Sequence, residues 1–324
     1  MQALVVPQAG DQQLTQLKWI ERPVPTPQAG EILIQTRAVG LNPVDYKVIE
    51  SGVDAWQYPH TVGLDVAGVV RAVGPNVQGF AVGQRVCGHG NLAVDGSFAE
   101  AVVATASAVT VIPDTVSFTQ AAGSLCAGLT AYQAIFRKAN LNNVHTVLIH
   151  AGAGGVGSMA IQLAKVAGKR VFTTVSAAKQ DFVRQLYPDT LIDYRTENVT
   201  QRIHDLTQGQ GVDLVVNTIG HPDADLPRLA YNGQLVCVLD TPTQVPASQA
   251  LTVSNLDLGG AHRSGNAAQV ADLGQMAHDL LALEAGGQVS PLITQVLDRR
   301  DIVAGLQDLA ADQVVGKVVA RFDA

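Results

Sequence analysis

Glycines at a fixed spacing are the most chemically informative residues of the chain. Gly152, Gly154 and Gly157 match the pattern G-x-G-x-x-G, and Gly155 enriches the same turn. An apolar strand-like run, VLI, precedes them, and a helical pattern, SMAIQLAKVAG, follows. In that context the glycines allow a tight turn, a close approach of backbone to a pyrophosphate, and close packing of helix on strand. We therefore expect a dinucleotide to bind here, with its phosphates at the helix N-terminus beside Val156.

The next strand bears on which nicotinamide cofactor binds. VFTTVS, residues 171–176, ends where an acidic residue would bind the ribose 2′-hydroxyl of NAD, about 20 residues beyond the first glycine. Ser176 stands there instead, followed by two alanines and Lys179. A hydroxyl and an ammonium suit a 2′-phosphate, which a carboxylate would repel. The residues therefore favour NADPH, with a solvated lysine at a helix start as the alternative for Lys179. Arg170 and Arg195 are weaker candidates for the phosphate.

Composition describes a globule with a large core and an acidic balance. Of 324 residues, 47 % are hydrophobic and 15 % are charged, and the formal net charge is −7. That balance disfavours nucleic-acid or anionic-membrane binding, which needs clustered Lys and Arg. No apolar run approaches the roughly 18 residues that span a bilayer. The start MQALVVPQAGD lacks a signal-peptide pattern, and the widely spaced Cys87, Cys126 and Cys237 make no disulfide framework. We expect a cytoplasmic protein.

Two kinds of pattern divide the chain. Residues 1 to about 113 hold short β-rich runs separated by Pro, Gly and Asn, which is typical of a mostly antiparallel β unit. From about 119 to 260, helical stretches alternate with apolar strand runs, namely TVLIHAG, RVFTTVS, TLIDYR, VDLVVNTIG and QLVCVLD. Such continuous apolar runs suit strands buried on both faces of a parallel sheet. Two amphipathic helices, at 271–287 and in DIVAGLQDLAADQ, and a last strand in GKVVARF complete the chain.

Stretches along nearly the whole chain resemble one enzyme superfamily. They are VGLNPVDYKV (39–48), GLDVAGVV (63–70), GFAVGQRV (79–86), LCAGLTAYQA (125–134), HAGAGGVGSMAIQLAK (150–165), IDYRTEN (192–198), VDLVVNTIG (212–220) and GKVVARF (316–322). In this order they resemble the medium-chain dehydrogenase/reductase superfamily, specifically its zinc-independent quinone oxidoreductase-like branch. The resemblance implies an α/β fold. A doubly wound parallel-sheet (Rossmann) nucleotide domain, residues 121–261, is inserted in a β-rich GroES-like catalytic domain, residues 1–120 and 262–324.

Many relatives use a catalytic zinc, and the matching ligand positions argue against one here. Where the zinc-dependent branch has its cysteine, this chain has Asn42. The Gly-His-Glu motif becomes Gly63–Leu64–Asp65, so the histidine ligand is lost as well. Cys126 falls near the third ligand position, but one thiolate does not make a site with three protein ligands. We expect no metal, a hydrogen-bonding structural role for Asp65, and a small buried side chain at Cys126.

Without a Lewis acid, hydride transfer needs an acceptor that takes the hydride readily. Quinones and α,β-unsaturated ketones or aldehydes do so, because the incoming charge is delocalised onto an oxygen. The protein then supplies binding, orientation and hydrogen bonds to that enolate-like oxygen. We therefore predict an NADPH-dependent, zinc-independent reductase of quinones or conjugated carbonyls. The alternatives are a zinc-type alcohol dehydrogenase-like activity on simple carbonyls and a non-catalytic NADPH-binding protein.

Candidate groups for the acceptor lie mainly in the N-terminal part. Asn42 matches an asparagine that lies at the nicotinamide or substrate edge in relatives. Tyr46 and Tyr58 are candidate donors to the developing oxyanion. NPVDYK is alternatively only a helix start, in which Pro43 suits the first turn and Asp45 the dipole. Further candidates are Lys47, Trp56 and His262, whereas His60 and His89 are expected to be loop histidines with satisfied hydrogen bonds.

The resemblance adds two cofactor contacts and an oligomeric state. Thr130, in AGLTAY, matches a position that approaches the nicotinamide in relatives. Tyr194, in IDYRTEN, matches a tyrosine beside the adenosine phosphate. The resemblance also implies a homodimer, formed through an edge strand of the nucleotide domain. QLVCVLD and ALTVSNLDL are the candidate edges, since an exposed edge needs covering.

Overall fold

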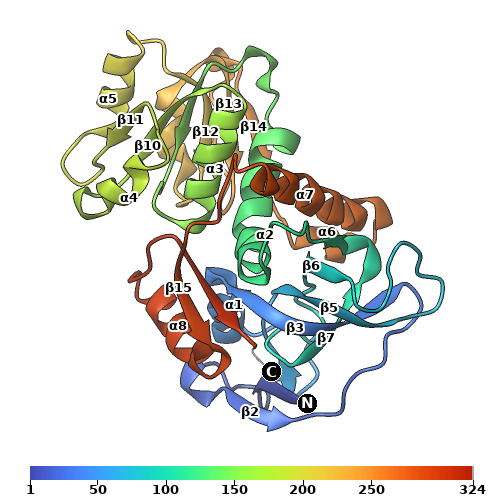
Figure 1. Ribbon diagram of the computed structural model, residues 1–324. Coiled ribbons are helices and arrows are strands. Elements are labelled where there is room, and N and C mark those ends of the chain that lie inside the picture. Colours follow the sequence, from blue (N-terminus) through green and yellow to red (C-terminus); the bar gives the residue numbers. More distant parts are fainter. Residues whose placement is uncertain (323–324) are drawn as a thin grey trace. The chain divides into compact units, whose positions relative to one another are not determined.

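The computed structural model describes residues 1–322, and the chain divides into two compact units (Figure 1). The terminal unit comprises Met1–Leu129 and the chain from Gly259 onward, and the central unit comprises Thr130–Leu258. The first division falls inside helix α2 (Phe118–Gln133), the same helix that contains the boundary expected at residue 121.

The central unit contains a six-stranded sheet in which all neighbouring strands are parallel. Its order is β11-β10-β9-β12-β13-β14, which is the 3-2-1-4-5-6 order of doubly wound nucleotide-binding folds. The strands are β9 (Thr146–Ile149), β10 (Arg170–Thr174), β11 (Thr190–Ile192), β12 (Val212–Asn217), β13 (Leu229–Cys237) and β14 (Thr252–Asn255). Leu148, Phe172 and Val215 are fully buried, which accounts for the continuous apolar runs. The predicted doubly wound sheet is confirmed.

Helices connect these strands. They are α3 (Gly155–Val166), α4 (Gln180–Arg184) and α5 (Val199–Leu206), with a 3₁₀ segment at Pro222–Arg228. Helix α3 packs on β9 and β10 through Ile161 and neighbouring apolar residues that are fully buried. The helix expected at 119–139 is α2 for most of its length, and its last turn is a π-helix at Ala134–Lys138.

The terminal unit is β-rich and almost entirely antiparallel, as expected. A seven-stranded sheet has the order β15-β16-β3-β5-β6-β8, with β7 paired to β3, and a small sheet has the order β2-β1-β4. The strands are β1 (Gln2–Val6), β2 (Lys18–Glu21), β3 (Glu31–Leu41), β4 (His60–Thr61), β5 (Asp65–Val73), β6 (Arg85–His89), β7 (Ala101–Thr105), β8 (Val109–Val111), β15 (Ile293–Asp298) and β16 (Lys317–Arg321). Strand β16 pairs with β3, which returns the end of the chain to this unit.

Besides the first part of α2, the described residues of the terminal unit form the helices α1 (Pro43–Ser51), α6 (Gly260–Arg263), α7 (Ala267–Ala285) and α8 (Ile302–Ala310). Helix α1 begins as the NPVDYK pattern predicts. Pro43 lies in its first turn, Asn42 is the N-cap, and Asp45 accepts a hydrogen bond from the Asn42 backbone N–H at 2.8 Å. Helix α8 packs against α1 in a core that also includes Leu41 and Val318.

One glycine sets the path of the chain into β5. Gly63 has a φ of +99°, and a Cβ at this position would lie 2.4 Å from the Phe98 ring. A side chain would therefore be strained and would collide with a fully buried aromatic residue. The turn at Gly63 leads directly into Leu64 and Asp65, which matter for the site described below.

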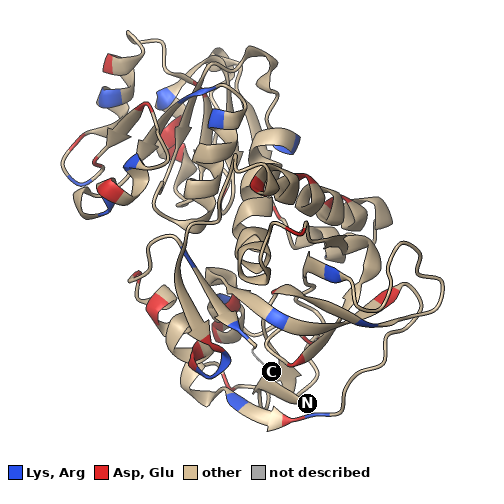
Figure 2. Cartoon of the chain, viewed as in Figure 1, with Lys and Arg blue, Asp and Glu red and all other residues tan. Residues whose placement is uncertain are grey.

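Charged residues of both signs are interspersed in each unit (Figure 2). This distribution agrees with the mixed, mildly acidic composition of the chain. Within residues 1–322, no helix has the length and apolar character that a membrane crossing requires.

Candidate active site and cofactor site

The glycine-rich turn joins β9 to α3 and is shaped by close backbone contacts. A Cβ on Gly157 would lie 2.2 Å from the Ala151 carbonyl oxygen, and one on Gly152 would lie 2.4 Å from Thr173 Oγ1. Both positions therefore require glycine in the protein itself. At Gly154 the nearest atom is 3.3 Å away, so packing does not require glycine as strictly there. Gly154 is the residue where the missing side chain leaves room for a ligand.

Helix α3 provides the electrostatic part of this cradle. It begins at Gly155, with Gly154 as its N-cap. The backbone N–H groups of Gly155, Val156 and Gly157 belong to the first turn, where the helix itself offers no acceptors. Together with the positive end of the helix dipole, they make a site that suits a pyrophosphate.

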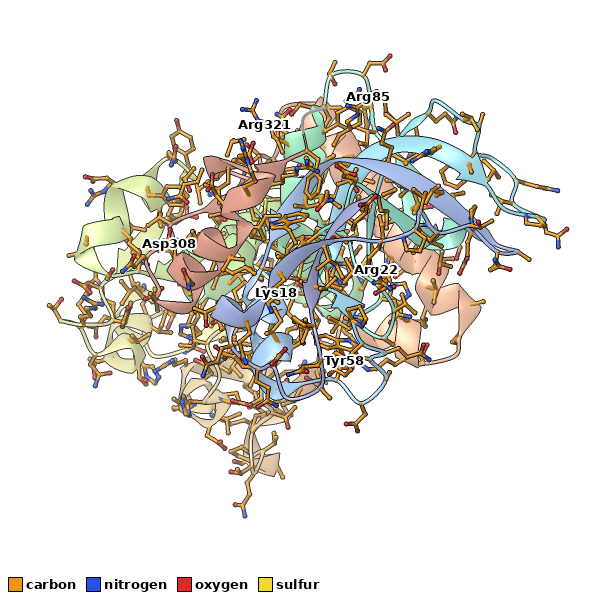
Figure 3. The ribbon with its side chains drawn as sticks, turned by 90° about the horizontal axis from the view of Figure 1, so that it is seen from below. Lys18, Arg22, Tyr58, Arg85, Asp308 and Arg321 are labelled. Atoms are coloured by element: carbon orange, nitrogen blue, oxygen red, sulfur yellow. The ribbon has the colours of Figure 1, made fainter. Side chains whose placement is uncertain are left out.

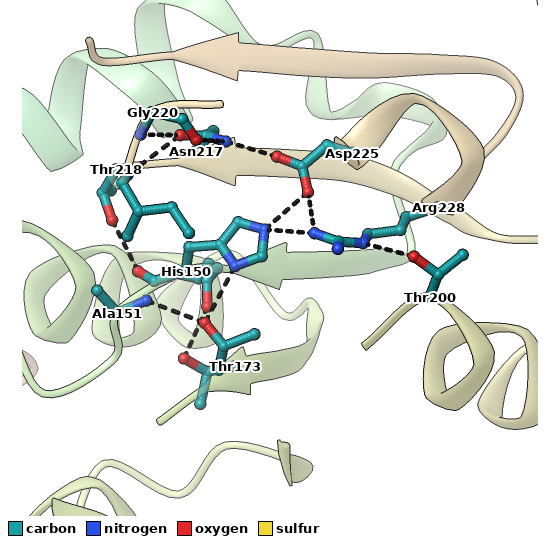
Figure 4. A network of polar contacts seen from close by, with 12 residues as sticks. His150, Ala151, Thr173, Thr200, Asn217, Thr218, Gly220, Asp225 and Arg228 are labelled. Atoms are coloured by element: carbon teal, nitrogen blue, oxygen red, sulfur yellow. Dashed lines mark hydrogen bonds and ion pairs between the residues drawn. The ribbon is translucent and has the colours of Figure 1, made fainter. Parts of the chain in front are cut away.

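A buried polar network lies directly behind the turn (Figure 4). His150 follows β9, and its Nε2 donates to Asp225 at 2.8 Å, while its Nδ1 accepts from Thr174 Oγ1 at 3.0 Å. Asp225 also accepts from the Asn217 amide and from Arg228, each at 2.6 Å. Burial acts to raise the pKa of Asp225, but His150, Asn217 and Arg228 outweigh it and lower that pKa. The carboxylate is therefore ionised and holds three partners.

This network joins the two loops that flank the point where the strand order reverses. The His150 carbonyl accepts from Thr218 Oγ1 at 2.9 Å, and Asn217 Oδ1 accepts from the Gly220 backbone at 2.9 Å. Strands β9 and β12 are neighbours there, and doubly wound folds bind ligands at such a point. His150 and Asp225 were not expected from the sequence. The feature of the sequence that could have indicated His150 is its position directly after an apolar strand.

The end of β10 is followed by the residues expected to determine whether NADPH or NADH binds. Ser176 is buried, and its carbonyl accepts from the Lys179 backbone N–H at 2.9 Å, so the two residues share one short turn. No acidic residue stands between β10 and Lys179, and Asp181, the next one, pairs with Arg184. Arg170 begins β10 and so lies at the opposite end of that strand.

The other expected cofactor residues lie in different elements of the central unit. Tyr194 follows β11 and is 50 % exposed, with the Arg195 guanidinium 5.9 Å from the centre of its ring. Thr130 is buried within α2. Their roles toward a cofactor stay predictions.

In the terminal unit, a second buried carboxylate gathers side chains from four elements. Asp65, in β5, accepts from His89 Nδ1 at 2.8 Å, from Asn42 Nδ2 at 2.8 Å, and from the Cys126 backbone at 3.1 Å. Lys317 Nζ lies 3.7 Å from the same carboxylate. Burial acts to raise the pKa of Asp65, but the His89 hydrogen bond and the Lys317 charge outweigh it and lower that pKa. Asp65 therefore has the structural hydrogen-bonding role expected of it, as an ion.

Asn42 is held by this group on both sides of its amide. Its Nδ2 donates to Asp65 and, at 3.3 Å, to the Gly40 carbonyl, and its Oδ1 accepts from Lys317 Nζ. Both amide hydrogens are thus directed at protein atoms, and the side chain also takes part in the capping box of α1 with the Asp45 backbone. The expected contact of Asn42 with nicotinamide or substrate stays a prediction.

A second carboxyl in the same cluster is kept neutral. Asp45 is buried, and burial together with the charge of Asp65 raises its pKa to about 8. Near neutral pH the cluster then holds one carboxylate, Asp65, and one ammonium, Lys317, whose charges balance. Lys317 is 4 % exposed and was not expected from the sequence. The feature of the sequence that could have indicated Lys317 is a lysine at the start of the otherwise apolar strand in GKVVARF.

The aromatic candidates belong to the apolar core beside α1. Tyr46 and Tyr58 pack against the apolar core that contains Trp56, and burial raises the pKa of Tyr46. The Trp56 ring lies edge-on to Tyr58, which is labelled in Figure 3, and stacks on His60 with centroids 4.2 Å apart. Lys47 is exposed. The roles of both tyrosines toward an oxyanion stay predictions.

Three local expectations were wrong. His60 and His89 lie in β4 and β6, because both pair with neighbouring strands, and they are not loop residues. Cys126 is partly rather than fully buried as a residue, although burial still raises the pKa of its thiol.

A pocket of about 480 Å³ opens within the terminal unit next to the Asp65 cluster. His89 and Leu64 line it beside the cluster, and Arg22, labelled in Figure 3, lines another part of it. His262 also lines the pocket, with its Nε2 3.3 Å from the His89 carbonyl oxygen. Its volume is that of a typical small-molecule site.

The residues at the zinc-ligand positions do not fit a catalytic zinc. Asn42 offers an amide already held by Lys317, and Leu64 offers no donor atom. Across residues 1–322, no group of three or more His, Cys, Asp or Glu side chains is arranged to hold a metal ion. Lys317 instead brings an ammonium to within 3.7 Å of the Asp65 carboxylate.

Comparison with known proteins agrees with this architecture. Residues 28–114 match the alcohol dehydrogenase GroES-like domain, and residues 155–279 match the zinc-binding dehydrogenase family. A quinone oxidoreductase of Pseudomonas aeruginosa is 31 % identical over 306 residues, which cover 90 % of this chain and 91 % of that protein. The chain therefore belongs to the medium-chain dehydrogenase/reductase superfamily, in its quinone oxidoreductase-like branch.

Two further relatives show how widely the fold is used. The mycobacterial protein Rv1454c, solved in complex with NADPH, has a TM-score of 0.85 at 30 % identity, covering 99 % of this chain and 100 % of that one. Erythronolide synthase EryA2 of Saccharopolyspora erythraea is 30 % identical over 304 residues. That match covers 93 % of this chain but spans only 8 % of the synthase.

The glycine turn yields a paired prediction. Gly154→Ala should fold with nearly unchanged stability, because a Cβ there meets only one atom, at 3.3 Å, yet it should weaken dinucleotide binding about tenfold or more. Gly157→Ala should itself lose about 1–3 kcal/mol of stability through overpacking. Thermal unfolding and fluorescence titration with NADPH measure both. A folded Gly154→Ala protein that binds like the wild type would contradict the assigned phosphate site.

The Asp65 cluster yields a pH-dependent prediction. Lys317→Met should cost about 3–5 kcal/mol near neutral pH, since it leaves a buried carboxylate without its cation. The pKa of Asp65 is lowered in the wild type, so its stabilising contribution is present above its usual pKa and is lost as pH falls further. The stability difference between wild type and Lys317→Met should therefore shrink as pH falls. Denaturant unfolding at several pH values measures it, and a pH-independent difference would contradict it.

Proposed function

We propose that this protein is an NADPH-dependent, zinc-independent reductase that transfers hydride to quinones or α,β-unsaturated carbonyls. The observation that carries the proposal is at the zinc-ligand positions, where the Asn42 amide is held by Asp65 and Lys317 and Leu64 has no donor atom. Without a Lewis acid to polarise a simple carbonyl, the acceptor has to spread the incoming charge over its own conjugated system. The names of the quinone oxidoreductase relatives support the same acceptor class.

The central unit supplies the residues for the cofactor. The first turn of α3 would hold the pyrophosphate, with Gly154 giving it room. Ser176 and Lys179 would offer a hydroxyl and an ammonium to the 2′-phosphate of NADPH, and no acidic residue lies between β10 and Lys179. When bound, the cofactor supplies a hydride. The NADPH complex of the mycobacterial relative supports this choice of nucleotide.

Steady-state kinetics with an acceptor panel tests the proposal. Wild-type protein should oxidise NADPH with benzoquinone and cyclohexenone, far faster than with cyclohexanone, and should prefer NADPH over NADH. Ser176→Asp places a carboxylate at the end of β10 and should shift the preference toward NADH about tenfold or more, whereas Ser176→Asn should not. NADPH binding without consumption would support the non-catalytic alternative. Stoichiometric zinc with turnover of simple alcohols would support the alcohol dehydrogenase alternative.

We also propose that the protein is a homodimer paired through β14. This strand is the last in the central sheet, and only β13 pairs with it among the described residues. An unpaired edge favours pairing with a second chain. Light scattering should give twice the 33.9 kDa mass of one chain. A mass of 33.9 kDa would refute the dimer.

A further inference from the structure

A relay of buried side chains, Asp225, His150 and Thr174, runs to the glycine-rich turn (Figure 4). The His150 ring lies between Asp225 Oδ1, 2.8 Å from its Nε2, and Thr174 Oγ1, 3.0 Å from its Nδ1. The Ala151 backbone N–H donates to the same Thr174 oxygen at 3.1 Å. The relay therefore connects a buried carboxylate to the first residue of the turn by hydrogen bonds that form away from bulk water.

The ionised carboxylate of Asp225 sets the direction of each bond in the relay. A carboxylate only accepts, so His150 donates from Nε2 and accepts at Nδ1, as a neutral imidazole with its proton on Nε2 does. The Thr174 hydroxyl then directs its one proton to Nδ1. A lone pair of the same oxygen is left to accept from the Ala151 N–H. The hydroxyl is thus held in the orientation that this backbone contact requires.

Ala151 adopts a backbone conformation that needs such a contact. Its φ is +52°, in the left-handed region that is unfavourable for a residue with a Cβ. Its carbonyl accepts from the Gly154 N–H at 2.9 Å, and a Cβ on Gly157 would lie only 2.2 Å from the same oxygen. Gly154 is the N-cap of α3, and Gly157 belongs to its first turn. The carbonyl of Ala151 therefore fixes the start of α3 relative to the end of β9.

Two other contacts hold the turn without acting on the Ala151 N–H. The Gly152 N–H donates to the Thr174 carbonyl at 3.0 Å, and Thr218 Oγ1 donates to the His150 carbonyl at 2.9 Å. Both contacts remain when the hydroxyl of Thr174 is removed. The hydroxyl is therefore the part of Thr174 that bears on the conformation of Ala151.

We propose that Thr174 is a positioning residue for NADPH, and that Asp225 acts through His150 to orient its hydroxyl. The proposal rests on the proposed function, since it concerns the same cofactor site. In the free protein the relay keeps Ala151 at positive φ, and keeps the N–H groups at the start of α3 in the arrangement that receives the pyrophosphate. NADPH then binds without first having to order the turn. Because the relay acts through the Ala151 backbone, it changes cofactor binding more than hydride transfer.

Thr174→Val tests the proposal, because valine keeps the shape of threonine and removes only the hydroxyl. Fluorescence titration should give an NADPH dissociation constant about tenfold or more above that of wild type, since Ala151 then leaves the positive-φ region for most of the time. The KM for NADPH should rise similarly, while kcat stays near the wild-type value. Thr174→Ser keeps the hydroxyl and should bind NADPH like wild type.

Thr146→Val is the matched control. The Thr146 hydroxyl also donates to a side chain, that of Asp213, at 2.8 Å, and accepts from a backbone N–H at 3.1 Å. Thr146 begins β9, so it lies at the opposite end of that strand from the glycine turn. Both valine variants should lose a similar few degrees of Tm, but only Thr174→Val should bind NADPH more weakly.

Two double variants separate positioning from general stability. Glycine takes a positive φ readily, so Ala151→Gly added to Thr174→Val should recover part of the lost NADPH affinity. Asp225→Asn should weaken NADPH binding by itself, but should add no further loss to Thr174→Val, since it acts through Thr174. Additive losses in both pairs would overturn the proposal and leave the relay a support of the fold.

Hydrogen exchange of wild type tests the same point without any variant. The Ala151 N–H should exchange slowly in the free protein, and NADPH should change its rate little, because the contact is already formed. Exchange that becomes slow only with NADPH would overturn the proposal, even if Thr174→Val does not fold. If wild type binds NADPH and folded Thr174→Val binds it equally well, only the role of Thr174 is rejected. If wild type does not bind NADPH, the proposed function fails, and the role of Thr174 fails with it.

Discussion

The buried carboxylate of Asp65 is the interaction on which the terminal unit depends. It draws Asn42 from the start of α1, His89 from the end of β6, the backbone of α2 at Cys126, and Lys317 from β16. An ion at this depth is tolerated only when its charge and lone pairs are satisfied. The return of β16 to β3 is thus more than a strand pairing, because it places Lys317 beside Asp65, where its charge adds to the His89 hydrogen bond in lowering the pKa of that carboxyl.

The central unit also contains a buried carboxylate whose hydrogen-bond partners are satisfied. Asp225 is also a buried carboxylate, and His150, Asn217 and Arg228 satisfy it. It fixes the ends of β9 and β12, while the glycine turn between β9 and α3 remains shaped for a ligand. Both units thus combine a rigid, ionic support with an adjacent site whose polar groups remain available to a ligand. Such support reduces the reorganisation that binding or reaction would otherwise require.

The sequence predicted the features that depend on neighbouring residues, and missed those that depend on distant ones. The spacing of Gly152, Gly154 and Gly157 and the helix start at Pro43 are local, and the structure has the turn and the helix that they predict. The ion cluster is not local: Lys317 and Asn42 are 275 positions apart, and no periodicity links them. The expectation that His89 lies in a loop was wrong for the same reason. Its place in β6, opposite Asp65, follows from the register of β5 with β6.

The residues at the zinc-ligand positions bear on which reactions the fold can support. A zinc ion stabilises charge directly on a substrate oxygen, whereas the Lys317 ammonium is directed at Asn42 and Asp65 and is buried. Its charge is therefore already compensated inside the protein. Stabilisation of a substrate oxygen has to come from hydrogen-bond donors at the pocket, and from conjugation within the substrate. A chain built in this way suits acceptors that stabilise part of the incoming charge themselves, which is the physical reason for the proposed preference for quinones and enones over simple ketones.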